Sequence, residues 1–539
     1  MKHSTSTCIA AVVLALVLTP SILVTPVAGQ SAGRLAAPPP RFEDAERARK
    51  LAAAFPEIDR VFREYAERAR VPGIAYGVLI DGQLAHAGGV GVRDVASKAA
   101  VDPDTVFRIA SMTKSFTALS ILKLRDEGRL SLDDLAERYV PELKGLAYPT
   151  DDSPRITIRH LLSHAEGFPE DNPWGDRQLA ASEEQFSEML RRGVPFSNPP
   201  GLAYEYSNLG FAILGRIVSR ASGIPYNDYV RANILKPLGM TSTTLDPSQV
   251  PPARLAHGYR WEAGEWKDEP HLADGAFGSM GGMLTSVRDL GRYVGFLMSA
   301  WPPRDDPDAG PVRRASMREM QQVWRAVPAG ASLRRGTGEP ELRMTAGGYG
   351  FGLRISQTCE FGHVVAHGGG LPGFGSLMQW LPEYGVGIIT MANLTYTGGG
   401  PAVAAAMDAL RRTGALQPRV IQPSPALVEM QDAVTRLVGQ WDEALADRIA
   451  AHNLFLDQPQ AQRRQALEGL RAKVGACRAQ GRIDAENALR GTWDLACERG
   501  TLRAAITLAP TMPPRVQWLV VQDVPPGAPP RRQPACRAE

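Results

Sequence analysis

The sequence predicts an α/β fold of the α+β type: an antiparallel sheet flanked by helices, with a helix-rich subdomain and a small C-terminal α+β domain. Two alternating apolar runs around Asp81-Gly82 indicate a β-hairpin near the start. Strand-like runs return between residues 349 and 395, whereas residues 111 to about 300 are mainly helical in pattern. Strands at both ends of a helical insert predict one sheet assembled from distant segments.

Length and charge limit the domain count and the kinds of partner. The chain has 539 residues, of which 44% are hydrophobic, and a single core stops growing at roughly 250–300 residues, so we expect at least two folded units. The 60 basic and 57 acidic residues nearly cancel to a formal charge of +3. So small a net charge gives no field that would attract nucleic acid or an anionic membrane, and we expect neither partner.

The first segment is typical of a secretory signal peptide. Residues 1–29 contain a basic start at Lys2, an apolar run and small residues at the end. An uncleaved anchor is the alternative, but Pro20 and Pro26 leave the run short of the ~20 residues that a membrane span needs. We therefore expect a periplasmic or secreted protein with no stable membrane span after cleavage.

The main domain is expected over residues 30–420. It begins with helical spacing over residues 43–70, followed by the hairpin and the helix-rich part. The later runs "YGFGLRI", "HVVAHGGG", "GSLMQWL" and "VGIITMAN" have strand character, and "PAVAAAMDALRR" forms a closing helix.

A Pro-rich linker, "QPRVIQPSPA", separates the accessory domain, which is expected over residues 426–525. Helical patterns come first ("LVEMQDAVTRLVGQW", "QAQRRQALEGLRAKVGA"), and the strand-like runs "RGTWDLACER", "TLRAAITLA" and "RVQWLVVQ" follow. Residues 526–539 are Pro- and Arg-rich, which predicts a disordered tail.

Ser-x-x-Lys occurs twice, and the local context separates the two copies. Ser111 precedes Lys114 at the start of a predicted helix, after a non-helical lead that contains Pro103. Backbone N–H groups and the positive end of the helix dipole are available there to a developing oxyanion. Ser120 lies nine residues further on and, at 100° per residue, faces the opposite side of the helix. Ser111 is therefore the candidate nucleophile.

Three motifs in chain order resemble those of the serine β-lactamase and penicillin-binding-protein superfamily. Ser111-Met112-Thr113-Lys114 resembles its nucleophile motif, and Tyr206-Ser207-Asn208 resembles the Tyr-x-Asn of class C β-lactamases and of related esterases and peptidases. His367-Gly368-Gly369 resembles the His-x-Gly that some members carry in place of Lys-Thr-Gly. The segments "ITIRHLLSHAEGFP", "SMGGMLTSVRDLGRY" and "YGFGL" also resemble the superfamily. The resemblance therefore covers roughly residues 45 to 415 and implies a β-lactamase-like fold.

The resemblance implies a role for each residue. Ser111 would form an acyl-enzyme after Lys114 or Tyr206 removes its proton, and both bases remain open. Asn208 would orient the lysine and the substrate amide, and the backbone N–H groups of Ser111 and Gly370 would form an oxyanion hole. His367 and Gly369 would contact the substrate. No metal or other cofactor is implied.

These assignments predict an exported serine hydrolase that acts on an ester, amide or D-amino-acid peptide, so its partners would be small-molecule or peptide substrates, including cell-wall fragments. A true β-lactamase or D-Ala-D-Ala carboxypeptidase is one alternative, and a penicillin-binding sensor without turnover is another. A metal hydrolase would use His160 and His164, four residues apart on an expected helix, but the Glu of His-Glu-x-x-His is missing.

Three further expectations concern single positions. His367 is mostly neutral near pH 7.5, so without another cation in the cleft we expect weak β-lactamase activity and better hydrolysis of neutral esters or amides. Glu166 occupies a place where the superfamily usually has another residue, and we expect it at the cleft rim. Export favours a disulfide between Cys477 and Cys497 in the accessory domain, and Cys359 and Cys536 leave other pairings open.

Overall fold

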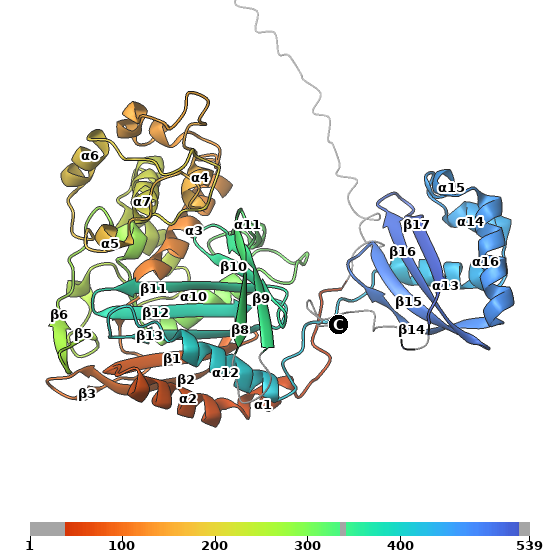
Figure 1. Cartoon of the computed structure of the whole chain (residues 1–539), viewed down its shortest axis with the longest axis horizontal. Coiled ribbons are helices and arrows are strands. Elements are labelled where there is room, and N and C mark those ends of the chain that lie inside the picture. The colour runs from red at the N-terminus through yellow and green to blue at the C-terminus, as the bar shows by residue number, and fades with distance from the viewer. Residues whose placement is uncertain (1–37, 335–340, 526, 528–539) are drawn as a thin grey trace, which may run out of the picture. The chain divides into compact units, whose positions relative to one another are not determined.

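The computed structural model describes residues 38–334, 341–525 and 527 (Figure 1). Within these residues the chain forms two compact units, and the boundary between them in the sequence falls between Ile421 and Gln422. The expected signal peptide lies outside the described residues, as does the expected tail apart from Gly527. Among the residues that the structure covers, no helix is both long and apolar enough to span a bilayer.

The first unit is built on a nine-stranded antiparallel sheet. Its first hairpin pairs with its last strand, so that Ile74 lies opposite Ala392. The sheet is thus assembled from both ends of the unit, as the sequence predicts. From edge to edge the strands are β3 (Ala99–Ala100), β2 (Gln83–Asp94), β1 (Gly73–Ile80), β13 (Val386–Ala392), β12 (Phe374–Leu381), β11 (Val364–Leu371), β10 (Arg354–Thr358), β9 (Glu341–Tyr349) and β8 (Arg325–Arg334).

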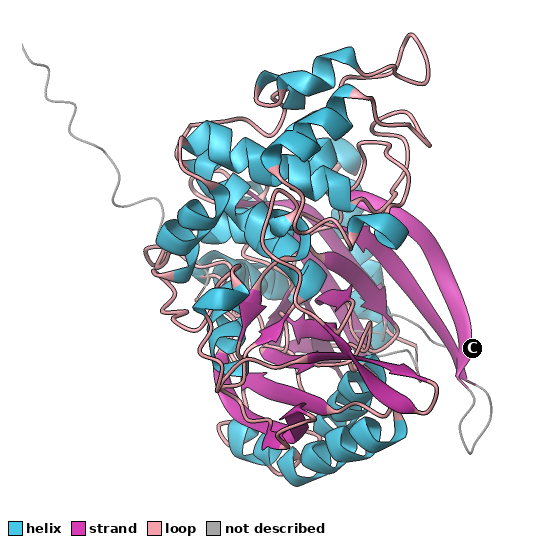
Figure 2. Ribbon diagram, turned by 90° about the vertical axis from the view of Figure 1, so that its left-hand side faces the viewer, coloured by secondary structure: helices cyan, strands magenta, loops and turns pink. Residues whose placement is uncertain are grey.

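Helices cover both faces of this sheet (Figure 2). Because side chains alternate along a strand, β1 sends Tyr76 and Val78 into one core and Ala75 and Leu79 into the other. The first core is closed by α1 (Arg47–Ala52), α2 (Phe55–Arg68) and α12 (Gly400–Arg412). The second is closed by helices that include α3 (Thr113–Asp126), α7 (Asn208–Ser222) and α10 (Val287–Met298).

The part between β3 and β8 is mainly helical, as predicted. Besides α3, α7 and α10 it contains α4 (Ile158–Leu162), α5 (Asn172–Gly175), α6 (Glu183–Arg191), α8 (Tyr226–Val230), α9 (Gly278–Gly281) and α11 (Arg314–Met320). Two small antiparallel pairs interrupt the helices. They are β4 (Phe107–Arg108) with β7 (Leu284–Thr285), and β5 (Gly258–Glu262) with β6 (Glu265–Glu269).

Two elements differ from the sequence pattern. The expected single helical segment over residues 43–70 divides into α1 and α2, because Pro56 lies in the first turn of α2, where its missing N–H and fixed φ suit a helix start. Strand β8 is not evident from the sequence because Pro328 and Gly330 break its alternation. The pairing of β8 with β9 shifts register at this point.

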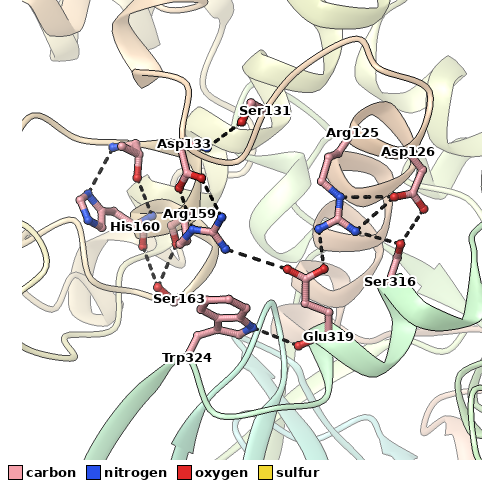
Figure 3. A network of polar contacts seen from close by, with 11 residues as sticks. Arg125, Asp126, Ser131, Asp133, Arg159, His160, Ser163, Ser316, Glu319 and Trp324 are labelled. Carbon is pink, nitrogen blue, oxygen red and sulfur yellow. Dashed lines mark hydrogen bonds and ion pairs between the residues drawn. The ribbon is translucent and has the colours of Figure 1, made fainter. Parts of the chain in front are cut away.

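A network of charges holds the far end of α3 (Figure 3). Glu319 of α11 forms ion pairs with Arg125 of α3 and with Arg159 of α4. Arg159 also bonds Asp133 at 2.8 and 3.0 Å, and its guanidinium lies 4.7 Å from the Trp324 ring centroid. The network therefore links α3, α4 and α11 at the end of α3 remote from Ser111.

The second unit is a four-stranded antiparallel sheet with helices, and Trp493 is fully buried in its core. Cys477 and Cys497 lie opposite each other on neighbouring strands and form a disulfide. The elements are α13 (Pro425–Gly439), α14 (Glu443–Ile449), α15 (Leu454–Asp457), α16 (Gln460–Val474), β14 (Cys477–Ala485), β15 (Arg490–Cys497), β16 (Gly500–Ala509) and β17 (Arg515–Asp523).

Candidate active site

Ser111 lies in a short 3-10 turn, Ala110–Met112, immediately before α3. The preceding residue, Ala110, has φ +49°, a left-handed conformation that costs a non-glycine residue of order 1–3 kcal/mol. Its carbonyl accepts a 2.7 Å hydrogen bond from the Thr113 hydroxyl, which in turn accepts one from the Met283 N–H. The surrounding packing thus holds the nucleophile on a strained, buried turn.

Lys114 is fully buried and faces Ser111. Its Nζ lies 3.2 Å from the Ser111 hydroxyl oxygen and donates to Asn208 Oδ1 at 2.6 Å and to the Met280 carbonyl at 2.8 Å. Burial lowers the pKa of Lys114 to about 7, against the opposing attraction of Asp176 and Asp171. A substantial fraction of Lys114 is therefore neutral near pH 7 and able to take the serine proton.

Tyr206 completes the group around Ser111. Its ring centroid lies 4.9 Å from Lys114 Nζ, and its hydroxyl hydrogen-bonds the Ser111 side chain. Burial raises the pKa of Tyr206 well above 10, and the bond to Ser111 only partly offsets this effect. Of the two candidate bases, Lys114 is the one with a pKa near neutrality.

Asn208 is positioned by the start of α7. Ser207 caps this helix, with its hydroxyl accepting from the Gly210 N–H at 3.0 Å. The carboxylate of Asp171 accepts the Asn208 N–H at 2.7 Å, which satisfies another N–H at the helix end. The Asn208 amide nitrogen donates to acceptors on the far side, so its oxygen faces Lys114.

Strand β11 packs closely against the backbone beside Ser111, because Gly369 has no side chain. A Cβ on Gly369 would lie 2.1 Å from the Ile109 carbonyl oxygen, and the neighbouring Ser376 hydroxyl donates to that oxygen at 2.7 Å. Gly370 and Ser111 therefore line the same cleft. The backbone N–H groups of these two residues are the ones assigned to the predicted oxyanion hole.

His367 is almost fully buried beside this strand. Its Nε2 lies 2.8 Å from the Tyr349 hydroxyl, and its Nδ1 lies 2.6 Å from the Gly368 carbonyl oxygen. Burial, with Arg354 and Lys114 nearby, lowers the pKa of His367 to about 3. The imidazole is neutral at physiological pH.

The cleft has a volume of about 780 Å³ and is open to solvent. One wall carries Arg354, whose guanidinium lies 5.8 Å from the Tyr206 ring centroid. A larger cavity of about 1170 Å³ lies elsewhere and contains none of the three motifs. The cleft is lined by Ser111, Glu170, Asn172, Asp176, Tyr204, Glu205, Tyr206, Arg354, His367, Gly368, Gly370 and Tyr396.

The expected helix carrying both His160 and His164 is wrong. Helix α4 ends at Leu162, and His164 has φ +53°. His160 belongs to a capping box with Thr157, whereas His164 is buried with its ring 4.3 Å from that of Tyr206. Burial lowers the pKa of His164 well below 6.5. Among the described residues, no three His, Cys, Asp or Glu side chains form a metal-binding group.

Glu166 is not at the cleft rim, where it was expected. It is fully buried next to α7, and a Cβ on Gly210 would lie 2.2 Å from its Oε1. Burial raises the pKa of its carboxyl group well above 4.5, which favours the protonated form.

Sequence reasoning missed Arg354, Tyr349, Asp171 and Asp176. The acidic loop "PEDNPWGD" and the run "YGFGLRI" contain all four residues, but neither pattern indicates that they lie around the Ser111 site.

Comparisons with known proteins agree with this geometry. The profile described as Beta-lactamase matches residues 58–412. Protein flp of Staphylococcus aureus (strain COL) is 29% identical over 343 residues, which are 63% of each chain. Penicillin-binding protein 4* of Bacillus subtilis (strain 168) is 25% identical over 58% of this chain and 66% of that protein. The chain thus spans less than two thirds of either relative.

A solved structure has the same fold. The octameric penicillin-binding protein homologue from Pyrococcus abyssi superposes with a TM-score of 0.56 at 20% identity, covering 84% of this chain and 96% of that chain.

Proposed function

Because the chain belongs to the Beta-lactamase family, within the serine β-lactamase and penicillin-binding-protein superfamily, we propose that it is a serine hydrolase that works through an acyl-enzyme on Ser111. The contact of Ser111 with a buried lysine of lowered pKa is the observation that carries this proposal. Neutral Lys114 would take the hydroxyl proton as Ser111 attacks the acyl carbon, and the leaving group would then depart with a proton.

The N–H groups of Ser111 and Gly370 would stabilise the oxyanion, because both residues line the cleft where an acyl oxygen would lie. Tyr206 would remain a neutral phenol that hydrogen-bonds the reacting oxygen. Asn208 would hold Lys114 and contact the substrate amide. Water in the open cleft would release the acyl group, which distinguishes this proposal from a penicillin-binding sensor without turnover.

The charges in the cleft support one class of substrate. Neutral His367 supplies no cation, but Arg354 does, and a guanidinium binds carboxylates in a bidentate manner. The expected preference for neutral esters required that no other cation lie in the cleft. We therefore propose amides or D-amino-acid peptides that carry a carboxylate, and the related β-lactam or carboxypeptidase substrates gain support over neutral esters.

We also propose that the protein is exported, because residues 1–29 resemble a secretory signal peptide. Export would bring it to the compartment where cell-wall peptides occur.

Covalent labelling with a fluorophosphonate, with a penicillin probe in parallel, tests the proposed function. Ser111→Ala should abolish labelling, whereas Ser120→Ala should retain it, since Ser120 is buried and its hydroxyl donates to the Phe116 carbonyl instead. Circular dichroism would check that both variants are folded. Labelling that persists in Ser111→Ala would refute the assignment. A panel of small esters, amides and D-amino-acid peptides would then show turnover, and a single burst without steady release would indicate a sensor.

A further inference from the structure

Asp176 is a buried carboxylate at the edge of the cleft. It directly follows α5, and only 3% of its surface is exposed. Its Oδ1 accepts from the Asn208 amide nitrogen at 3.2 Å, and its Oδ2 accepts from the Tyr396 hydroxyl at 3.1 Å. Neither bond is to a cation, so the charge of Asp176 acts on the rest of the site through space.

The orientation of the Asn208 amide depends on this carboxylate. An amide offers donors on one side and an acceptor on the other. Asp176 and Asn172 both present acceptor oxygens, at 3.2 and 3.1 Å, to the Asn208 nitrogen. A flipped amide would turn its oxygen toward these acceptors and its NH₂ group toward the Lys114 ammonium. The observed orientation, with Oδ1 accepting from Lys114, is the one that satisfies every group.

Resting on the proposed function, we propose that Asp176 is a positioning residue, which orients the Asn208 amide toward Lys114 and provides the negative charge that sets the protonation of Lys114. The negative charge of Asp176 raises the pKa of Lys114, and it does so more strongly than that of Asp171. Burial and the charge of Arg354 lower the same pKa. Removing one carboxylate should therefore favour neutral Lys114.

Other titratable groups surround Asp176 and Lys114. Burial raises the pKa of Asp176 to about 6, and Lys114, Tyr396 and Asn208 counteract that rise. The two pKa values lie close together, so the protons leave the pair in coupled steps. The further titratable groups facing the pair are His164, His367 and Tyr206, all of which are neutral near pH 7, together with the carboxyl group of Asp171 and the guanidinium of Arg354.

Tyr396 brings the opposite wall of the cleft into this arrangement. It follows β13 with φ +55°, and its ring covers Gly370, where an added Cβ would lie 2.5 Å from Cδ1 of Tyr396. The Asp176–Tyr396 bond therefore joins the helical side of the cleft to the strand that carries the proposed oxyanion hole.

The test measures the second-order rate of fluorophosphonate labelling of Ser111 against pH, in the full chain. In this reaction Ser111 Oγ forms the bond to phosphorus, fluoride leaves, and the hydroxyl proton passes to the base. Asp176→Asn keeps the shape and an acceptor for Asn208 but removes the charge. The acidic limb of the profile should move to lower pH by about one unit or more, since an adjacent opposite charge shifts a pKa by ~1–3 units.

Glu205→Gln is the matched charge control. Glu205 lines the same cleft, but its bonds are to Ser197, Asn198 and the Glu170 N–H, not to Asn208. The acidic limb of the pH profile of Glu205→Gln should stay at the wild-type pH. Tyr396→Phe removes only the hydroxyl that favours ionised Asp176, and it should move the limb in the same direction by less.

The positioning role would be overturned if the acidic limb of the labelling profile did not move in Asp176→Asn. It would also be overturned if the limb moved by the same amount in Glu205→Gln. If Asp176→Asn does not fold, an unmoved limb in Tyr396→Phe would overturn it instead. Failure of the proposed function would look different, because wild-type Ser111 would then not be labelled at any pH.

Discussion

The Tyr349 hydroxyl lies 2.8 Å from His367 Nε2, while Nδ1 of the same ring lies 2.6 Å from the Gly368 carbonyl oxygen. Burial raises the pKa of Tyr349 well above 10, so Tyr349 donates its proton to Nε2 and Nδ1–H donates to the carbonyl. In this neutral tautomer both ring nitrogens of His367 are already engaged in hydrogen bonds within the protein. A substrate carboxylate must therefore find its cation elsewhere, and Arg354 lines the same cleft.

Arg354→Gln should lower kcat/KM for carboxylate-bearing substrates by roughly ten- to a hundred-fold, since a charged hydrogen bond contributes ~1.5–3 kcal/mol. A chromogenic cephalosporin and a D-Ala-D-Ala peptide would represent this class. A small neutral ester, as the control, should change little. Equal losses on both kinds of substrate would show that Arg354 supports the structure of the cleft and does not select substrates.

Gly369→Ala should destabilise the first unit by about 1–3 kcal/mol, because its Cβ would overlap the backbone beside the nucleophile turn. Gly368→Ala is the matched control, since its Cβ would meet no atom closer than 3.6 Å. Thermal unfolding of the two variants should separate them, with only Gly369→Ala shifted to lower Tm. Similar Tm values would contradict the close approach of β11 to Ile109.

Glu166→Gln should change how stability depends on pH. The carboxyl has a pKa well above 4.5 in the folded protein, so above pH 4.5 the unfolded chain loses a proton that the folded chain keeps. Wild-type stability therefore falls as pH rises from about 5. Replacing the acid with a neutral amide removes this loss, so the Tm difference between variant and wild type should grow in favour of the variant from pH 5 to 8. A constant difference would mean that Glu166 is ionised.

Replacing both Cys477 and Cys497 with Ser should destabilise the second unit. The disulfide closes a loop with a sequence separation of 20, which restricts the unfolded chain by about 3 kcal/mol on the chain-entropy model. Hydrogen–deuterium exchange of peptides from residues 425–523 at increasing denaturant would report on the unfolding of this unit alone. Labelling of Ser111 should be unaffected, since the first unit has its own core. An unchanged unfolding midpoint would show that the disulfide has no stabilising role.

The local motifs predicted which residues lie around Ser111 better than they predicted the rest of the cleft. Ser111 and Lys114 are one helical turn apart, so their contact follows from spacing alone, and Tyr206 and Asn208 join them at a helix start. Arg354 could not be found in this way, because it reaches the cleft through the pairing of β10 with β11.

The misplacement of Glu166 and His164 has a common physical reason. Polar residues in a loop are usually expected at the surface, but here the loop after α4 turns inward against α7. The left-handed backbone at His164 makes that turn, and no residue type in the sequence signals it. Burial of two ionisable side chains depends on neutral protonation states, which a sequence does not display.

The pairing of β1 with β13 joins segments that are synthesised far apart in time. Ile74 cannot pair until Ala392 of β13 has been made. The turn that carries Ser111 likewise needs Gly369 of β11, which packs against Ile109. At ~5–20 residues per second, a ribosome needs roughly 15–60 s to make the intervening chain. Until then Ser111 and Lys114 lack the strand that forms the other side of the cleft, so the proposed acylation would require the complete first unit.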